Sequence, residues 1–187
     1  MIEKKSPGVA SAKPSSRGLV QIFTGDGKGK TSAALGVVVR AVGYGLRVCV
    51  IFFMKGDYPY GEFFTLPKLL NVDVASFGFR RLTDPANVKP EEIEQARQAL
   101  AAAREALLGG KYDLVVLDEV NVAAAWKLVD LEEVIKLIRD RPPQVELVLT
   151  GRYADPRLIE LADLVTVMTK VKHPYDKGVP ARKGFEY

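Results

Sequence analysis

Short apolar runs alternate along the chain with longer segments in which apolar residues recur at helical spacing. A run of about five apolar residues bounded by turn residues is typical of a strand buried on both faces. The runs that predict strands are residues 19–23, 48–53, 72–76, 114–117, 145–149 and 164–168. The segments that predict helices are residues 31–42, 62–70, 90–108, 131–139 and 156–161. Because helices separate uniformly apolar strands, the pattern predicts an α/β fold: a mainly parallel sheet of about six strands with helices on both faces.

Start and stop signals support several of these helices. Pro90 is followed by two glutamates, as at the first turn of a helix, and two glycines follow residue 108. Asp130 is a capping residue for the segment 131–139. Pro67 is expected to interrupt or shift the helix predicted for residues 62–70.

The length of 187 residues fits one domain. Residues 1–17 are rich in Lys, Ser, Pro and Ala and lack periodicity, which predicts a flexible arm before a single domain over residues 18–187. The chain has one cysteine and one histidine, so an intrachain disulfide and a Cys/His zinc site are both excluded. Cys49 lies in an apolar run and is expected in the core.

Charge and hydropathy narrow the class of protein further. No apolar stretch approaches the roughly 20 residues of a membrane-spanning helix, and no apolar segment follows the N-terminal residues, so we expect a cytoplasmic protein. The net charge of +4 suits a protein that binds a polyanion such as a nucleoside triphosphate. Basic residues form no long run, so no nucleic-acid partner is expected.

The sharpest motif follows the first predicted strand and opens the first predicted helix, where a phosphate-binding loop belongs. It consists of Thr24, Gly25, Asp26, Gly27, Lys28, Gly29, Lys30, Thr31 and Ser32. Its glycines let backbone N–H groups surround phosphate oxygens, Lys30 supplies a charge, and the Thr31 hydroxyl can bind Mg²⁺. The strict spacing requires glycine where Thr24 stands, so the loop is a variant. The alternative is a plain Gly-rich turn before a helix.

A pair of acidic residues follows the fourth predicted strand. An Asp at the end of a buried strand places its carboxylate beside the Mg²⁺ of a nucleotide site, and Asp118 has that position. Glu119 is a candidate base for water or a residue of the metal site. The alternative is that both are merely exposed acids at a strand end.

Three further features lie at loops or in the tail. Arg152 follows the fifth predicted strand and can reach a phosphate, although a surface arginine explains it equally well. The loop at residues 77–81 combines aromatic and cationic side chains that suit stacking on a flat ligand, or simply loop packing. His173 is, on residue type alone, a surface histidine rather than a catalytic one.

These features share one place in the predicted fold. Ligands of parallel α/β sheets bind beyond the carboxyl ends of the strands. The segments at those ends are residues 24–32, 54–61, 77–85, 118–121 and 150–152. From the residues alone, the chain is a Mg-nucleotide-binding domain with no specific reaction.

The set of motifs is more specific than any one of them. It comprises residues 17–19, 24–31, 53–56, 78–79, 116–120, 149–152, 161–163 and 171–181. Together they closely resemble the P-loop family of ATP:corrinoid adenosyltransferases of the cobalamin-dedicated type, from about residue 17 to the end of the chain. The resemblance implies a RecA-like domain that forms a homodimer, with its nucleotide reversed relative to ordinary P-loop enzymes.

The implied reaction transfers the 5′-deoxyadenosyl group of ATP to the Co(I) of a corrinoid and releases triphosphate. A reduced flavoprotein is the implied electron donor. Lys30, the loop amides, Mg²⁺ on Thr31, and Arg152 would stabilise the leaving triphosphate. Asp118 and Glu119 would complete the metal site, and His173 would join the binding residues.

The resemblance also implies aromatic residues below the corrin that displace its lower ligand. Phe79 matches one such position, but Arg81 stands where the second aromatic is expected. Phe77, Phe79 and Leu82 can share that role. In relatives, the N-terminal arm covers the partner's active site.

Two other functional classes compete with this interpretation. An ordinary P-loop ATPase or small-molecule kinase would release phosphate or ADP instead of triphosphate. A nucleotide-dependent binding module would show salt-dependent binding to DNA.

Overall fold

The structure, a computed structural model, describes residues 17–56 and 58–187. Over this range the strands form one six-stranded sheet in the order β3-β2-β4-β5-β1-β6, and every pair is parallel. The strands are β1 (Val20–Thr24), β2 (Val48–Phe52), β3 (Val72–Ser76), β4 (Leu114–Asp118), β5 (Glu146–Thr150) and β6 (Leu164–Val167). The predicted α/β class with a parallel sheet is confirmed.

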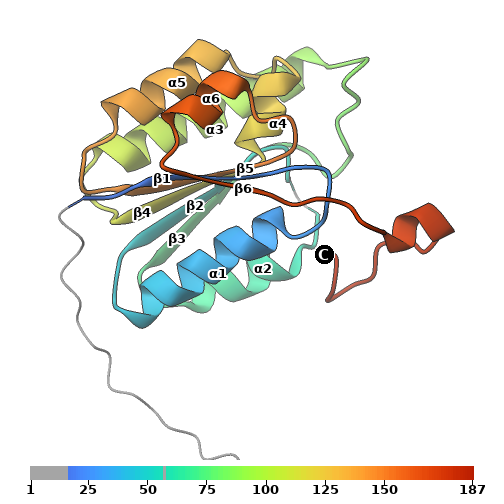
Figure 1. The fold of residues 1–187 in the computed structure, drawn as a ribbon, viewed down its shortest axis with the longest axis horizontal. Helices are drawn as coiled ribbons and strands as arrows, with labels where there is room; N and C mark the ends of the chain where they lie inside the picture. Colours follow the sequence, from blue (N-terminus) through green and yellow to red (C-terminus); the bar gives the residue numbers. More distant parts are fainter. Residues whose placement is uncertain (1–16, 57) are drawn as a thin grey trace, which may run out of the picture.

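Helices cover both faces of the sheet (Figure 1). The first layer holds α1 (Lys30–Gly43), α2 (Gly61–Thr65) and a short 3-10 helix, η1 (Leu66–Lys68). The opposite layer holds α3 (Pro90–Leu108), α4 (Val120–Ala125), α5 (Leu131–Asp140) and α6 (Pro156–Leu161). A second 3-10 helix, η2 (Pro174–Lys177), lies in the tail that projects beyond β6 (Figure 1).

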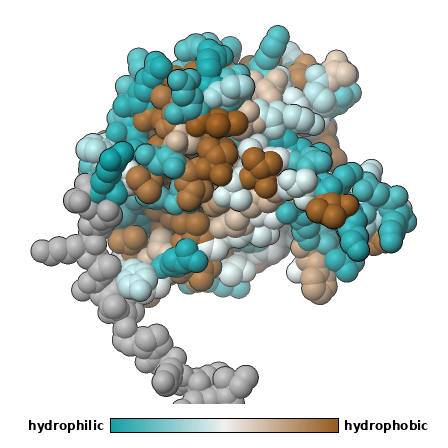
Figure 2. All heavy atoms as spheres, viewed as in Figure 1, coloured by the Kyte–Doolittle hydropathy of each residue, from teal (hydrophilic) through white to brown (hydrophobic). Residues whose placement is uncertain are grey.

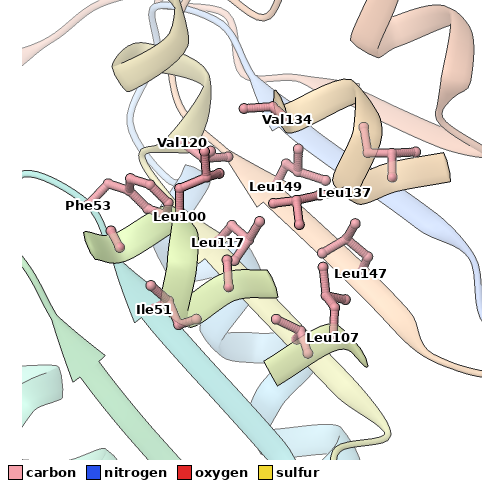
Figure 3. Close-up of a cluster of buried hydrophobic side chains, with 14 of the residues drawn as sticks. Ile51, Phe53, Leu100, Leu107, Leu117, Val120, Val134, Leu137, Leu147 and Leu149 are labelled. Carbon is pink, nitrogen blue, oxygen red and sulfur yellow. The ribbon is translucent and has the colours of Figure 1, made fainter. Parts of the chain in front are cut away.

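The two layers bury alternate residues of the central strands, because successive side chains of a strand point to opposite faces. In β2, Val48, Val50 and Phe52 join the core under α1, whereas Cys49 and Ile51 join the core under α3 and α5. Figure 3 shows the second of these clusters, in which leucines of α3 and β5 pack against β2 and β4. Both faces are therefore apolar, which is why the strands appear as continuous apolar runs in the sequence.

The elements differ from the prediction in three places. The expected helix at residues 62–70 is two pieces, α2 and η1, with Pro67 in the first turn of the second piece. Helix α4 and the 3-10 helix η2 were not predicted. By contrast, α3 and α6, which both begin with proline, have the predicted bounds.

Strand β6 forms an exposed edge of the sheet. It pairs only with β1 among the described strands, and Leu164 and Val167 are 41% and 61% exposed. Figure 2, drawn from the side of this edge, shows apolar residues gathered along the middle of the face. An unpaired apolar edge is a surface on which another chain can pack.

Two predictions concern the limits of the chain. The arm at residues 1–17 lies outside the described residues except for Arg17, so it stays a prediction. In the described part of the chain, no helix is both long enough and apolar enough to span a bilayer.

The buried thiol of Cys49 gives a test of the core. Burial raises its pKa to about 11, so the thiol is protonated at pH 8 and is also shielded from reagents. We expect the native protein at pH 8 to react with a disulfide reagent at least 100-fold more slowly than the same protein unfolded in urea. Labelling of the native protein at the rate of the unfolded chain would contradict the burial of Cys49.

Candidate functional site

The loops that follow the strands enclose a cavity of about 520 Å³ at the carboxyl edge of the sheet. Six residues predicted from the sequence line it together: Gly27, Lys28, Lys30, Glu119, Arg152 and His173 of the tail. Residues of the loops after β2 and β3 line it as well. The structure thus brings the predicted phosphate loop, Glu119, Arg152 and His173 to one cavity.

The predicted phosphate loop, residues 24–32, is shaped by its contact with the end of β6. Gly27 donates its backbone N–H to the Met168 carbonyl at 2.7 Å, and a Cβ on Gly27 would lie 2.8 Å from that oxygen. Gly25 has a φ of 101°, in the region that favours glycine, and a Cβ there would meet the same carbonyl at 2.4 Å. The displaced glycine spacing therefore matches a loop that packs against β6.

Other residues of the loop are held by their neighbours. The Thr24 hydroxyl accepts from the Ala154 N–H at 3.4 Å, and Asp26 accepts from the Lys170 N–H at 3.1 Å. That hydrogen bond lowers the pKa of the Asp26 carboxyl. Gly29 has a φ of 121° directly before α1, and Ser32 is an exposed residue of its first turn.

Lys30 lies inside the loop rather than in solvent. Its ammonium donates to the carbonyls of Gly25 at 3.0 Å and Gly27 at 2.7 Å, and the residue is buried. Burial lowers the pKa of Lys30, and the negative charge of Glu119 offsets part of that effect. Among the described residues, the hydrogen-bond partners of this buried ammonium are neutral carbonyls, so its charge favours an anion as a further partner.

Asp118 is the most deeply buried acid of the site, at 1% exposed. Its Oδ1 accepts from the Thr150 hydroxyl at 2.7 Å, and its Oδ2 lies 2.7 Å from the Lys55 ammonium. The Thr150 hydroxyl in turn accepts from the Glu119 N–H at 3.0 Å. The carboxylate is therefore oriented through both of its oxygens.

Glu119 follows Asp118 with a left-handed backbone, φ 65°, and starts helix α4. Its side chain is half-buried, and burial raises the pKa of its carboxyl, with the nearby Asp118 charge adding to the effect. The alternative that both acids are merely exposed at a strand end is wrong, because Asp118 is fully enclosed.

Lys55 is a candidate site residue that the sequence analysis did not single out. Its side chain is 12% exposed, and its ammonium lies 3.4 Å from the Thr31 hydroxyl as well as 2.7 Å from Asp118. Burial alone would lower the pKa of Lys55, but the Asp118 carboxylate outweighs it, and the pKa is raised. The only signal was a lysine in the loop after β2, within the segment 53–56.

The donor set around this ammonium fits a divalent cation. One cationic atom already contacts both the Thr31 hydroxyl and the Asp118 carboxylate, the oxygen ligands that Mg²⁺ takes from protein beside a nucleotide. Across residues 17–56 and 58–187, no group of three or more His, Cys, Asp or Glu side chains could hold a metal. A magnesium ion here would depend on phosphate oxygens and water for its remaining ligands.

The C-terminal tail crosses the site. The Lys28 ammonium donates to the Phe185 carbonyl at 2.9 Å and to Glu186 Oε1 at 2.8 Å. The Tyr187 ring packs edge-on against Tyr58 with centroids 5.1 Å apart. These residues close a second cavity of about 430 Å³ that also contains Thr31, Ser32 and Lys55. Nothing in the local sequence pattern predicted this contact.

The aromatic loop after β3 lies at the rim. Phe79 is not among the residues that line the described cavities, and the Arg81 guanidinium stacks on its ring at 4.6 Å. Arg81 also pairs with Glu91 at 3.0 Å. Phe77 packs against the core under α3, whereas Leu82 is 89% exposed and lines the larger cavity.

Comparison with known proteins identifies relatives over the full domain. The model of the family described as "ATP:corrinoid adenosyltransferase BtuR/CobO/CobP" matches residues 16–187. The chain is 38% identical over 186 residues to a corrinoid adenosyltransferase of Escherichia coli (strain K12), covering 99% of this chain and 93% of that protein. It is 38% identical over 174 residues to a corrinoid adenosyltransferase of Pseudomonas aeruginosa, with 91% and 84% covered. It is 38% identical over 172 residues to "Corrinoid adenosyltransferase CobA" of Salmonella typhimurium, with 91% and 86% covered.

The Thr150 hydroxyl gives a test of how the site is held. Thr150→Val keeps the shape of this fully buried side chain but removes the donor to Asp118 and the acceptor for the Glu119 N–H. We expect a loss of about 1–3 kcal/mol in the free energy of unfolding, measured in urea. Thr166→Val, on the exposed part of β6, is the matched control and should change stability by less than about 0.5 kcal/mol. Equal stabilities of the two variants would contradict the proposed role of the hydroxyl.

Proposed function

The chain belongs to the ATP:corrinoid adenosyltransferases and is a transferase that adenosylates corrinoids, and we propose that the site at the carboxyl edge of the sheet carries out this transfer. The observation that carries the proposal is that Thr31, in the loop beside the cavity, and the buried, oriented Asp118 both contact one cationic atom, the Lys55 ammonium. A polyphosphate and its counter-ion are the ligands that this combination fits.

The reaction requires placement more than acid–base chemistry. The Co(I) centre of the corrinoid attacks C5′ of ATP, the Co–C bond forms, and the C5′–O bond breaks with its electron pair on the leaving triphosphate. No proton has to be removed from the nucleophile. The protein has to align C5′ with cobalt and to stabilise the charge that develops on triphosphate.

We propose that Lys30, Lys28 and Arg152 stabilise that triphosphate, with the N–H groups of residues 24–32 around it. Lys30 supports this role because its present partners are neutral carbonyls, which a phosphate oxygen can replace with a gain in charge pairing. His173 lines the same cavity from the tail and is proposed to contact the nucleotide.

We propose that Thr31 and Asp118 hold Mg²⁺, with Glu119 orienting water beside it. When bound, Mg²⁺ would neutralise phosphate charge as the triphosphate leaves. Asp118 is suited to this because Thr150 fixes one of its oxygens, while the other contacts the Lys55 ammonium, which the Thr31 hydroxyl also contacts. Glu119 needs no role as a base, since the reaction takes no proton from its nucleophile.

We propose that the corrin ring lies against the loop after β3, with Phe79 and Leu82 as its apolar contacts. The Arg81 guanidinium is flat and stacks on Phe79, so it offers a planar surface where the second aromatic residue is replaced. Phe77 is less suited to this role, because it packs into the core. Unchanged turnover of Co(II) corrinoid by Phe79→Ala would contradict this assignment.

We propose a cytoplasmic homodimer that receives electrons from a reduced flavoprotein. The apolar, unpaired edge at β6 supports association with a second copy. A monomeric mass by light scattering at micromolar concentration would contradict the dimer. The use of ATP and a single buried, unpaired cysteine are typical of a cytoplasmic enzyme.

The decisive experiment is anaerobic. With MgATP and chemically reduced cob(I)alamin, we expect the absorption spectrum of a light-sensitive Co–C product together with one equivalent of triphosphate. Phosphate or ADP without a Co–C product would instead support an ATPase or kinase and would overturn the corrinoid assignments.

Substitution of the loop lysine tests the phosphate site. Lys30→Ala removes a buried charge from the position proposed for triphosphate. We expect adenosyl transfer to slow because its activation free energy rises by about 2–4 kcal/mol. Lys136→Ala, at an exposed position of α5, is the control and should retain the wild-type rate. A near-wild-type rate for Lys30→Ala would show that phosphate binds elsewhere.

A further inference from the structure

The Lys55 ammonium occupies the point at which the Thr31 hydroxyl and the Asp118 carboxylate converge. It lies 2.7 Å from Asp118 Oδ2, 3.4 Å from Thr31 Oγ1 and 3.9 Å from Glu62 Oε1. Those first two oxygens are the ones proposed above for Mg²⁺. A side-chain cation therefore lies at the position proposed for the metal cation.

This placement is built into the fold rather than being a surface contact. The Lys55 backbone N–H donates to the Phe77 carbonyl at 3.0 Å, and the Ser76 hydroxyl donates to the Lys55 carbonyl. The ammonium also lies over the rings of Phe52 at 5.3 Å and Tyr60 at 4.9 Å, which favour a cation. Backbone and side chain are thus both fixed beside Asp118.

Electrostatics makes the ammonium and a metal ion alternatives at this point. Asp118 is almost fully buried, so its charge requires one cation, and Lys55 supplies it. A divalent ion on the same carboxylate oxygen and hydroxyl would lie within a few ångströms of the ammonium, where the two like charges repel strongly in a partly dry site. One of the two must leave when the other binds.

We propose that Lys55 is the resident counter-ion of the metal position, that Mg²⁺ displaces it from Asp118, and that the released ammonium then binds the phosphate chain. The inference rests on the proposed function only in taking the ligand to be a Mg-nucleotide. Lys55 lines both the 520 Å³ and the 430 Å³ cavity, so phosphate in either one lies near its side chain.

The consequence is that metal and nucleotide bind together. Metal alone has to displace the Lys55 ammonium from Asp118, and it provides no new anionic partner for that ammonium. Metal with a polyphosphate supplies that new partner. Free divalent metal should therefore bind weakly, and Lys55 should favour metal-bound nucleotide over either component alone.

The test uses Mn²⁺ as the metal probe, with free Mn²⁺ measured by electron paramagnetic resonance, and needs no corrinoid. Lys55→Met removes the charge but keeps the length of the side chain. Without nucleotide, we expect this variant to bind Mn²⁺ at least tenfold more tightly than the wild type. With Mg²⁺ present, its affinity for ATP, measured by calorimetry, should be at least tenfold weaker than that of the wild type.

Two further variants serve as controls. Lys111→Met removes a lysine charge from an exposed pair with Asp73, 2.5 Å apart, and should leave both affinities unchanged. Asp118→Asn combined with Lys55→Met should abolish the gain in Mn²⁺ affinity. If Lys55→Met does not fold by circular dichroism, Lys55→Gln, which keeps a donor for Asp118, replaces it.

Each unfavourable outcome overturns the proposal. Unchanged or weaker Mn²⁺ binding by Lys55→Met would show that the ammonium does not compete with metal. Unchanged ATP affinity would show that the ammonium does not move to phosphate. A rise in the melting temperature of the wild type with micromolar Mn²⁺ alone would contradict the weak binding of free metal. If these results are as expected but no Co–C product forms, the assignment of adenosyl transfer to this site is wrong, whereas the exchange of Lys55 for metal at Asp118 is supported.

Discussion

The burial of the Asp118 carboxylate is the constraint on which the site depends. An ionised carboxylate with 1% exposure is tolerated only if hydrogen bonds and an opposite charge compensate for the water it has lost. Thr150 supplies the hydrogen bond and Lys55 supplies the charge. Asp118, Thr150 and Lys55 lie at or just after the ends of three different strands, so the pairing of the Asp118 charge holds three loops together.

The strand order explains why these partners are available. In the sheet, β4 lies between β2 and β5, so the strands that precede Lys55 and carry Thr150 are its immediate neighbours. All strands are parallel, so their carboxyl ends meet at one edge. Thr31 then arrives from the first turn of α1, which packs on the same sheet (Figure 1). The topology thus places the Thr31 hydroxyl and the Asp118 carboxylate where a single cation, the Lys55 ammonium, contacts both.

The sequence predicted those features that depend on local pattern. The central strands β1, β2, β4 and β5 were predicted because both of their faces are buried, and α3 and α6 because proline marks their first turn. Helix α4 was missed because it is only six residues long, VNVAAA, and follows a left-handed Glu119 instead of a capping side chain. Its apolar residues carry no helical period that distinguishes them from a loop.

The same distinction applies to the site. The motif of residues 24–32 and the aspartate after β4 are recognisable because each is a short segment with its own chemistry. The position of Lys55 depends on how far one side chain reaches across two loops, which no spacing in the sequence encodes. The contact between Lys28 and Glu186 spans 158 positions, so only the folded chain reveals it.

The cations of the site share one property that bears on ligand selection. Each of them has an internal partner: Lys30 donates to loop carbonyls, Lys28 to Glu186 and Lys55 to Asp118. Each of these internal contacts has to be broken before a ligand can take its place, which costs free energy on binding. A ligand with one negative charge can replace only one of these internal contacts, and the other lysines keep their internal partners. A polyphosphate with its divalent ion replaces all of them at once, since the metal takes the place of Lys55 at Asp118 while the phosphates receive the lysines. The internal pairing of the lysines therefore weakens the binding of small anions more than the binding of a triphosphate with its divalent ion.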